Sequence, residues 1–292
     1  MCVAPAATLP SEVTESRNGA STQTRPGAVR RARRKLARWL APEVEAELRE
    51  TRRKLKTARS KLRAARGEGA RALPPEVEEA ITRARAEHLT YLKREHLRDL
   101  ASVVLELEDR RLPGLLVEAG TARGGSAIVM AAAKSAERPM KVYDVFGMIP
   151  PPTERDGADV HERYEAIAGG QAKGVGGETY YGYRDDLYGE VTDSFARLGV
   201  PTAEHNVELV QGLFEDTIDL DEPVAFAHLD GDWYESTMTC LTRIAPLVVP
   251  GGRIVLDDYY AWSGCRAAVD EYFSDRAEFR LERRAKLHVI RS

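Results

Sequence analysis

The chain has 292 residues and a formal net charge of −3, a length that suits one large domain or one domain with an extension. No stretch approaches about 18 consecutive apolar residues, and the first residues lack the basic and apolar regions of a secretory signal, so we expect neither a transmembrane segment nor a leader. Its three cysteines, Cys2, Cys240 and Cys265, have no metal-ligand spacing and are odd in number, which favours a reduced, cytoplasmic setting.

Charge is distributed unevenly along the chain. Residues 1–85 contain 20 Lys and Arg against 10 Asp and Glu, whereas the remainder contains 23 against 36. This split predicts a basic arm attached to an acidic globular domain. We expect residues 1–27, which are rich in Ala, Ser, Thr and Pro, to form a disordered tail, and residues 28–70 to form a basic helical extension.

Within this extension, apolar and small residues recur at alternating steps of four and three. The spacing predicts a short coiled coil with a thin core, made of Val44, Leu48, Thr51, Leu55, Ala58, Leu62 and Ala65. Residues 52–66 carry eight Lys or Arg and no acid. Three interpretations stay open: a solvated amphipathic helix, a dimerisation helix, or a helix that docks on an acidic surface. Nucleic-acid binding is not expected, because basic character alone supplies only non-specific affinity and no aromatic platform is interleaved with it.

A break at "GEG" (67–69) and "LPPE" (73–76) precedes the main domain. We expect residues 71–112 to be its helical N-terminal part, with a helical stretch over about 76–109, and residues 113–292 to be its catalytic part. From residue 114 onward, short apolar runs alternate with helical segments, and each run ends in Gly or a carboxylate. The runs are "LLVEAG" (115–120), "MKVYDV" (140–145), "VELVQG" (207–212), "AFAHLD" (225–230) and "RIVLDD" (253–258).

The end of the chain, "EFRLERRAKLHVIRS" (278–292), holds two short alternating runs and predicts a closing antiparallel hairpin. Together these elements predict an α/β fold, in which an open, mostly parallel seven-stranded sheet has helices on both faces. The interval between the second and third strands is about 60 residues, longer than a bare connection requires. It is rich in Gly, Tyr and Pro, which favours a lid at about 147–205, although a plain surface insertion is the alternative.

The turn after the first strand has the composition of a cofactor-binding loop. In "VEAGTARGGSAIVMAAAK" (117–134), Gly120 closes the strand, and Gly124 and Gly125 precede a helix whose first N–H groups are free to bind a ligand. This spacing is not the three-glycine fingerprint of dinucleotide-binding proteins. Asp144 closes the second strand 24 residues beyond Gly120, where an acid can bond both hydroxyls of a ribose, although it could instead cap a loop. With Glu118 near the methionine part, the pattern points to S-adenosylmethionine.

Two further strand ends carry carboxylates, in "HLDGDWYES" (228–236) and "VLDDYY" (255–260). Because these strands should end beside the first, we expect Asp230, Asp257 and Asp258 to converge. Three adjacent carboxylates cannot all stay ionised without a cation, since each raises the pKa of its neighbours. An all-oxygen site suits Mg²⁺, with Mn²⁺ or Ca²⁺ as alternatives, although one or two of the acids could instead be helix caps or salt-bridged.

Asp232, two residues beyond Asp230, is a candidate general base. A metal at the neighbouring carboxylates would hold two oxygens of a substrate and lower the pKa of the attacking one, and Asp232 would accept the proton. His228 alternates with Ala227 and Leu229 along the strand, so we expect a buried structural histidine there.

Five ordered motifs together resemble the macrocin O-methyltransferase family over roughly residues 85–292: "VEAGTARGGSA", "YDVFGMIPPP", "VQGLFEDT", "AHLDGDWYES" and "PGGRIVLDDY". The resemblance implies a class I S-adenosylmethionine- and Mg²⁺-dependent enzyme that methylates sugar hydroxyls. It matches Asp230, Asp257 and Asp258 to metal ligands and Asp232 to the general base. The implied cofactor pocket comprises Glu118, Gly120, Thr121, Ser126, Asp144, Gly212, Phe214 and Asp230, and Asp230 joins Asp232 in the expected catalytic pair. The turns "GTARGG" and "VFGMIPPP" depart from the family pattern on the acceptor side.

The expected function is therefore O-methylation of a sugar hydroxyl on a glycosylated natural product, as in antibiotic biosynthesis. Methylation of a catechol-like or other small diol, or of an oligosaccharide, is the enzymatic alternative, because a metal bound to two oxygens serves each of them. A non-catalytic scaffold that binds the cofactor is the alternative from another class. We also expect a homo-oligomer, as is frequent in the family that the motifs resemble.

Overall fold

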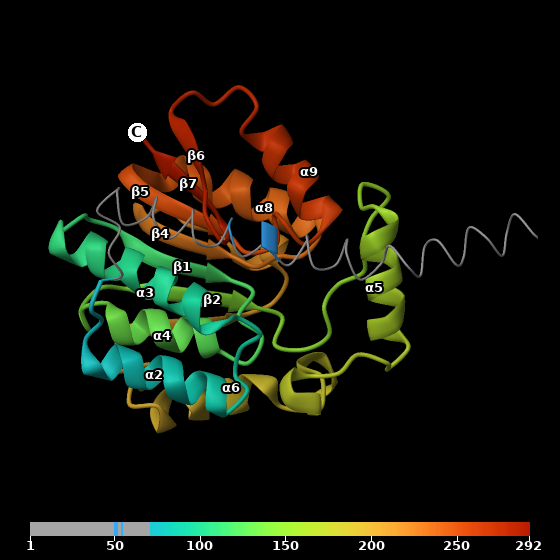
Figure 1. The fold of residues 1–292 in the computed structure, drawn as a ribbon, viewed down its shortest axis with the longest axis horizontal. Helices are drawn as coiled ribbons and strands as arrows, with labels where there is room; N and C mark the ends of the chain where they lie inside the picture. Colours follow the sequence, from blue (N-terminus) through green and yellow to red (C-terminus); the bar gives the residue numbers. More distant parts are fainter. Residues whose placement is uncertain (1–49, 52–53, 55–70) are drawn as a thin grey trace, which may run out of the picture. The chain divides into compact units, whose positions relative to one another are not determined.

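The computed structural model describes residues 50–51, 54 and 71–292, and every strand and helix discussed below lies within Arg71–Ser292 (Figure 1). The predicted tail over 1–27 lies outside the described residues. So does the predicted basic extension over 28–70, with its coiled coil, apart from positions 50–51 and 54, which are helical.

Seven strands form one sheet in the order β3-β2-β1-β4-β5-β7-β6. Their bounds are β1 (Leu115–Ala119), β2 (Met140–Asp144), β3 (Val207–Gln211), β4 (Val224–Leu229), β5 (Val248–Leu256), β6 (Phe279–Arg283) and β7 (Leu287–Arg291). The first five pair in parallel, and β7 pairs antiparallel with both β5 and β6. This confirms the predicted sheet and its closing hairpin, and it places β4 next to β1 and β5 next to β4.

The central strands are apolar because both of their faces are covered. Every residue of β1 and β4 is buried, and successive side chains enter opposite layers, as the two-residue period of a strand requires. Leu116 belongs to the cluster on one face, whereas Leu115 and Val117 belong to the cluster on the other.

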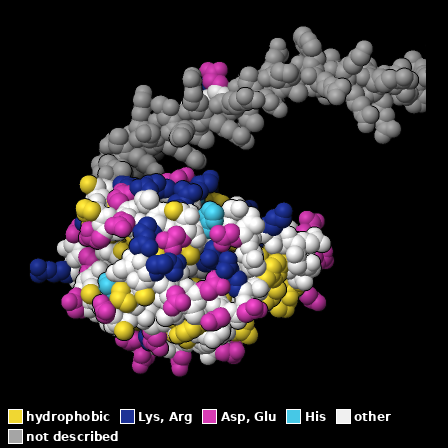
Figure 2. Space-filling model, turned by 90° about the horizontal axis from the view of Figure 1, so that it is seen from below, with side chains coloured by type: hydrophobic (Ala, Val, Ile, Leu, Met, Phe, Trp, Pro, Cys, Tyr) yellow, Lys and Arg dark blue, Asp and Glu magenta, His cyan; other side chains and the backbone are white. Residues whose placement is uncertain are grey.

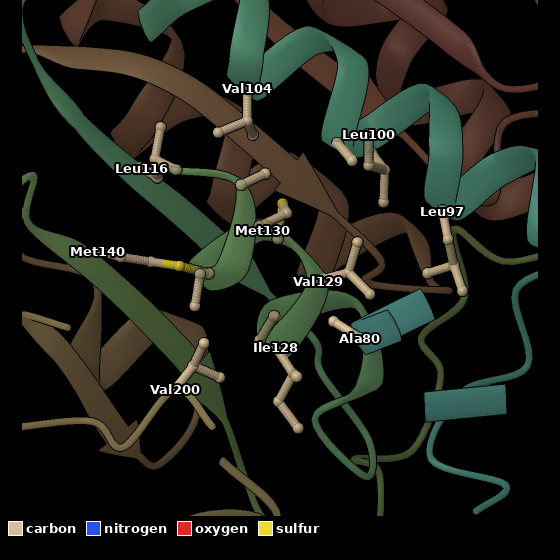
Figure 3. Close-up of a cluster of buried hydrophobic side chains, with 14 of the residues drawn as sticks. Ala80, Leu97, Leu100, Val104, Leu116, Ile128, Val129, Met130, Met140 and Val200 are labelled. Carbon is tan, nitrogen blue, oxygen red and sulfur yellow. The ribbon is translucent and has the colours of Figure 1, made fainter. Parts of the chain in front are cut away.

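Helices form a layer on each face of the sheet (Figure 1). The first layer consists of α2 (Pro75–Ala86), α3 (Arg94–Asp109), α4 (Gly125–Ala133) and α6 (Leu187–Arg197), and the second of α7 (Phe214–Thr217), α8 (Tyr234–Ile244) and α9 (Ser263–Tyr272). Almost all of α4, "GSAIVMAAA", is buried, because it lies between the sheet and the pair α2 and α3. Figure 3 shows its side chains Ile128, Val129 and Met130 among those of α3 and of the strands.

The stretch predicted as helical over about 76–109 is two helices, which corrects that expectation. The connector 87–93 separates α2 from α3, and within it His88 has a φ of 54°. Leu89 is buried, and its carbonyl accepts a hydrogen bond from Gly125 N at 3.0 Å. A tertiary contact with the cofactor-type turn therefore interrupts a sequence whose local pattern is helical.

The long interval between β2 and β3 forms a layer of its own before it returns to the sheet. Helix α5 (Ala158–Ala168) stands away from the sheet in Figure 1, and the short 3₁₀ turns Val175–Gly177 and Tyr181–Tyr183 follow it. Apolar residues of this interval, among them Ile149, Val160 and Tyr180, pack around Trp233 in a third cluster. Helix α6 instead packs into the cluster beneath α2 and α4. We call residues 147–186 the insertion.

Charges of both signs are interspersed on the face that carries α2 and α6 (Figure 2). Glu87, at the end of α2, pairs with Arg83 at 3.3 Å and with Arg197 of α6 at 2.8 Å. Within the described residues, no helix is both long and apolar enough to cross a membrane.

One lysine of the first layer makes stability depend on pH. Lys134, at the end of α4, is 6 % exposed, and its ammonium donates to the carbonyls of His205 and Ser135. Burial lowers the pKa of Lys134 to about 8. Below that pH the ammonium is charged in both the folded and unfolded states, so the desolvation penalty is fully present. As the pH rises toward the unfolded value of about 10.4, the folded protein has released a proton that the unfolded chain keeps, and the penalty fades.

We therefore expect Lys134→Met to raise the free energy of unfolding by about 1–2 kcal/mol at pH 7 and by less at pH 10. Urea denaturation of wild type and variant at the two pH values measures the difference. Lys173→Met, which replaces an exposed lysine, is the control and should show no such trend. A gain that is equal at both pH values would contradict the assignment.

Candidate functional site

Three carboxylates meet where β4 and β5 end. Asp230 follows β4, and Asp257 and Asp258 follow β5. One oxygen from each lies within 4.8 Å of the others. Asp257 is 9 % exposed and Asp258 5 %, so their charges are held mostly out of water. The structure thus brings together the three residues that the strand ends singled out.

The pKa values of the three carboxylates are shifted in different directions. Burial raises the pKa of Asp230 well above its usual range, and the charges of Asp258 and Asp257 raise it further. Burial and the charge of Asp257 also raise the pKa of Asp258. The pKa of Asp257 is instead lowered, because His228 and Lys286 outweigh its burial. The ammonium of Lys286 contacts Asp257 Oδ2 and donates to the carbonyl of Asp257 at 2.9 Å.

Behind the cluster, the ionisable side chains of Glu118, His228 and Asp257 form a buried row. His228 Nδ1 lies 2.8 Å from Glu118 Oε1, and His228 Nε2 lies 3.7 Å from Asp257 Oδ1. Burial opposes the charged imidazole, but Asp257 and Glu118 raise the pKa of His228 to about 9. Thr121 donates from its hydroxyl to the other oxygen of Glu118 at 2.6 Å. His228 is buried as expected, and it also links the β1 turn to Asp257.

The acidic cluster fits a divalent cation. Asp257 Oδ1 is buried and accepts no hydrogen bond from any described residue, and its ion-pair neighbour His228 Nε2 lies 3.7 Å away, farther than the usual partner of a buried polar atom. A set of carboxylate oxygens alone suits a hard cation such as Mg²⁺. Asp230, Asp257 and Asp258 are the residues that would hold it.

Asp232 lies beside the cluster but outside the three-residue set. It has a φ of 56°, in the left-handed region that Asp tolerates better than most residues. Its amide donates to Asp258 Oδ2 at 3.1 Å. Burial raises its pKa well above the usual range, as does the charge of Asp258, while a hydrogen bond with Trp262 opposes both effects. Asp232 is therefore held as a carboxyl of raised basicity.

Asp144 shapes the cofactor-type turn. Its Oδ2 accepts from Thr121 N at 2.7 Å and from Ala122 N at 3.0 Å, and its Oδ1 accepts from Phe146 N at 2.7 Å. A carboxylate has about four acceptor positions, so about one is left for a ligand, fewer than bonds to both ribose hydroxyls would use. Burial raises the pKa of Asp144, and these three amides oppose the rise.

A cavity that opens to solvent lies at this edge of the sheet. Of the predicted residues, the lining includes Gly120, Asp144, Phe214, Asp230 and Asp232. Glu118, Thr121, Ser126, Gly212, Asp257 and Asp258 are not among the lining residues. Glu118 is fully buried, with both oxygens bonded to protein, so its part is to position its neighbours.

The lining also includes residues that we did not single out from the sequence. They are Val145, Ile149, Pro150, Tyr181, Leu213, Glu215, Gly231, Trp233 and Ser236. Tyr181, Ile149 and Pro150 come from the insertion, and only its "PPP" and "YYGY" runs could have pointed to them in the sequence. No sequence pattern pointed to Lys286, because its position depends on the pairing of β7 with β5.

Comparison with known proteins identifies the family. Residues 43–280 match the model of the macrocin-O-methyltransferase (TylF) family. The chain belongs to this family. The family predicted from the motifs is confirmed, and with it an S-adenosylmethionine-dependent O-methyltransferase.

Several relatives of this TylF-family chain are known. It is 30 % identical over 207 residues to demethyldecarbamoylnovobiocin O-methyltransferase of Streptomyces niveus, a match that covers 67 % of this chain and 70 % of the relative. It is 30 % identical over 175 residues to mycinamicin III 3''-O-methyltransferase of Micromonospora griseorubida, covering 55 % of this chain and 61 % of the relative.

Among solved structures, the O-methyltransferase NovP superposes with a TM-score of 0.58 at 27 % identity, over 70 % of this chain and 82 % of NovP. The calicheamicin methyltransferase CalS11 superposes with a TM-score of 0.50 at 18 % identity, over 77 % and 95 % of the two chains, and supports the fold alone.

The acidic cluster can be tested without an acceptor. We expect the double variant Asp257→Asn, Asp258→Asn to bind Mn²⁺ more than about 100-fold more weakly, because two anionic ligands are lost. Electron paramagnetic resonance of free Mn²⁺ measures this affinity. Binding of S-adenosylhomocysteine, followed by calorimetry, should persist.

Asp221→Asn, at an exposed aspartate, is the matched control for this experiment. Wild-type Mn²⁺ affinity in the double variant would argue against the assigned ligands. Circular dichroism shows whether the double variant is folded.

Proposed function

We propose that this enzyme transfers the methyl group of S-adenosylmethionine to a sugar hydroxyl of a glycosylated natural product, with a divalent cation, Mg²⁺ foremost. The observation that carries the proposal is the convergence of Asp230, Asp257 and Asp258 next to a cavity that Asp230 and Asp232 line. The names of the relatives support the acceptor class. One relative, 34 % identical over 167 residues, 55 % of this chain and 58 % of its own, is a 4'-O-methyltransferase of a rhamnosyl-tetracenomycin from Streptomyces olivaceus.

In this proposal, the chain's residues do three things. The acidic cluster holds the cation, which when bound would fix two vicinal oxygens of the acceptor and lower the pKa of the reacting hydroxyl. Gly120, Asp144 and Phe214 line the part of the cavity assigned to S-adenosylmethionine. Tyr181, Trp233 and Ile149 help enclose the cavity and limit water, which would compete for the acceptor position.

The reaction is a displacement at carbon. A lone pair of the acceptor oxygen forms a bond to the methyl carbon, the bond from that carbon to sulfur breaks, and its electron pair stays on sulfur to give the neutral thioether. Asp232 accepts the hydroxyl proton. Holding oxygen, methyl and sulfur in line supplies much of the acceleration, because a bimolecular encounter becomes a reaction within one complex.

Glu118, His228 and Thr121 act as positioning residues in this scheme. The hydrogen bonds from Thr121 and His228 fix Glu118 at the end of β1, and His228 places a positive charge against Asp257. Lys286 contacts Asp257 on its other oxygen. These contacts keep Asp257 ionised and oriented toward the cluster. Cys240 and Cys265 are buried free thiols, in keeping with a proposed cytoplasmic setting.

The proposed base gives a direct prediction. Asp232→Asn preserves size and the backbone contact with Asp258 but removes the proton acceptor. We expect kcat to fall by about 10²–10⁴-fold, while calorimetric affinities for S-adenosylhomocysteine and Mn²⁺ stay within about threefold. Asp193→Asn, on the exposed face of α6, is the control. A loss of less than about tenfold would remove Asp232 from the role of base.

The acceptor class is tested by paired substrates. A panel of natural-product glycosides and their matching aglycones is incubated with enzyme, Mg²⁺ and labelled S-adenosylmethionine, and products are located by mass spectrometry. We expect methyl transfer to glycosides, on the sugar, with none to the aglycones. Transfer to a catechol or another phenolic diol, with none to any glycoside, would favour the alternative function.

A further inference from the structure

Two of the contacts that fasten the insertion to the rest of the domain differ in character. Near its start, Asp156 is 7 % exposed and accepts a hydrogen bond from Tyr234 N at 2.8 Å. A side chain at Gly264 would lie 1.9 Å from Asp156 Oδ1. Trp233 Nε1 also donates to Pro150 O at 3.0 Å. This first attachment is buried and closely packed, so it should hold under all conditions in which the protein is folded.

The second attachment is the carboxylate of Glu178, which is exposed to solvent. Its Oε1 lies 3.0 Å from His88 Nδ1, and its Oε2 lies 2.6 Å from Arg123 and 3.3 Å from Arg184. His88 follows α2, Arg123 belongs to the turn between β1 and α4, and Arg184 belongs to the insertion. The hydrogen bond with His88 is the main cause of a lowered pKa of Glu178, and the charge of Arg123 adds to it. One side chain therefore joins three segments.

The chain around Glu178 is shaped for this contact. Residues Lys173 and Thr179 form a bridge, and Gly174 N donates to the carbonyl of Glu178 at 2.8 Å, so a short turn presents the carboxylate. At its tip, Gly176 has a φ of 68°, and a Cβ there would lie 2.4 Å from the His88 ring. Only glycine lets the turn lie so close to His88.

The turn determines where an active-site side chain lies. Tyr181 follows Glu178 by three residues and lines the cavity. Its ring centroid lies 4.3 Å from that of Tyr180 and 6.2 Å from that of Tyr91 in the α2–α3 connector. Burial raises the pKa of Tyr181 well above its usual value, and the nearby charge of Asp232 raises it further. Displacement of the turn would therefore move a ring away from the proposed base.

We propose that Glu178 is a positioning residue for methyl transfer: its ion pairs hold residues 173–183 of the insertion in the closed position, with Tyr181 over the cavity. Release of these pairs opens the acceptor side, while the Asp156 attachment stays in place. The side chain of Glu178 is 40 % exposed, that of His88 37 %, and those of Arg123 and Arg184 18 %, and salt screens partly exposed ion pairs. These contacts of Glu178, which we call the latch, can therefore be released while the buried attachment holds. The inference rests on the proposed function, because it assigns the cavity to the cofactor and the acceptor.

The test compares Glu178→Gln with Glu162→Gln, an exposed glutamate on α5 of the same insertion. Hydrogen exchange of full-length protein is measured for residues 173–183 and for β1, with and without S-adenosylhomocysteine. We expect Glu178→Gln to exchange about fivefold faster over 173–183 with β1 unchanged, and Glu162→Gln to match wild type. In 1 M KCl, where the Debye length is about 3 Å, wild type should approach the variant.

Kinetics separate positioning from a purely structural role. With an accepted glycoside, Glu178→Gln should raise the KM for the acceptor about fivefold and leave kcat within about twofold, since the closed state still forms at saturation. Unchanged exchange over 173–183 in Glu178→Gln overturns the latch. Failure of wild type to bind S-adenosylhomocysteine overturns the proposed function instead, and the exchange comparison without ligand still decides the latch.

Discussion

The balance of charge at the carboxyl edge of the sheet governs the rest of the site. Asp257 and Asp258 are buried, Asp230 and Asp232 are half-buried next to them, and Glu118 is fully buried behind the cluster. Lys286 and the charged His228 supply two positive charges, and both of them act on Asp257. The other three aspartates have raised pKa values, so without a cation each of them binds a proton more readily than an ordinary aspartate. A dication replaces those protons with charge at the same place, which makes the proposed metal and the proposed base parts of one electrostatic unit.

The backbone makes that crowding possible. Parallel pairing in the order β1, β4, β5 ends all three strands at one edge, and close approach of β1 to β4 brings the cofactor turn against the acids. Gly120 permits this approach, since a Cβ there would lie 2.1 Å from Asp230 O. The left-handed backbone at Asp232 then separates the proposed base from the metal set within two residues. Strain of this kind persists at functional sites because the surrounding packing fixes it.

Much of this could be predicted because it depends on short-range pattern. Apolar runs that end in Gly or Asp predicted the parallel strands, because a parallel sheet brings such strand ends together at one edge. The features that were not predicted depend on tertiary contacts. Lys286 reaches Asp257 only through the antiparallel register that pairs Leu287 with Leu256. The α2–α3 break needs the bond between Leu89 and Gly125. The three backbone amides on Asp144 come from a turn whose conformation spacing alone does not specify.

The two sides of the site are therefore held together by different kinds of contact. The side assigned to chemistry rests on buried, short contacts, so few substitutions there leave the charges balanced. The acceptor side consists of the α2–α3 connector and the insertion, which meet through the exposed pairs of Glu178 and the edge contact of Tyr91 with Tyr181. Arg123 belongs to "GTARGG", and it joins the turn after β1 to Glu178. Substitutions at the latch, where contacts are partly exposed, could thus change the acceptor without disturbance of the carboxylates to which we assign the cation and the proton.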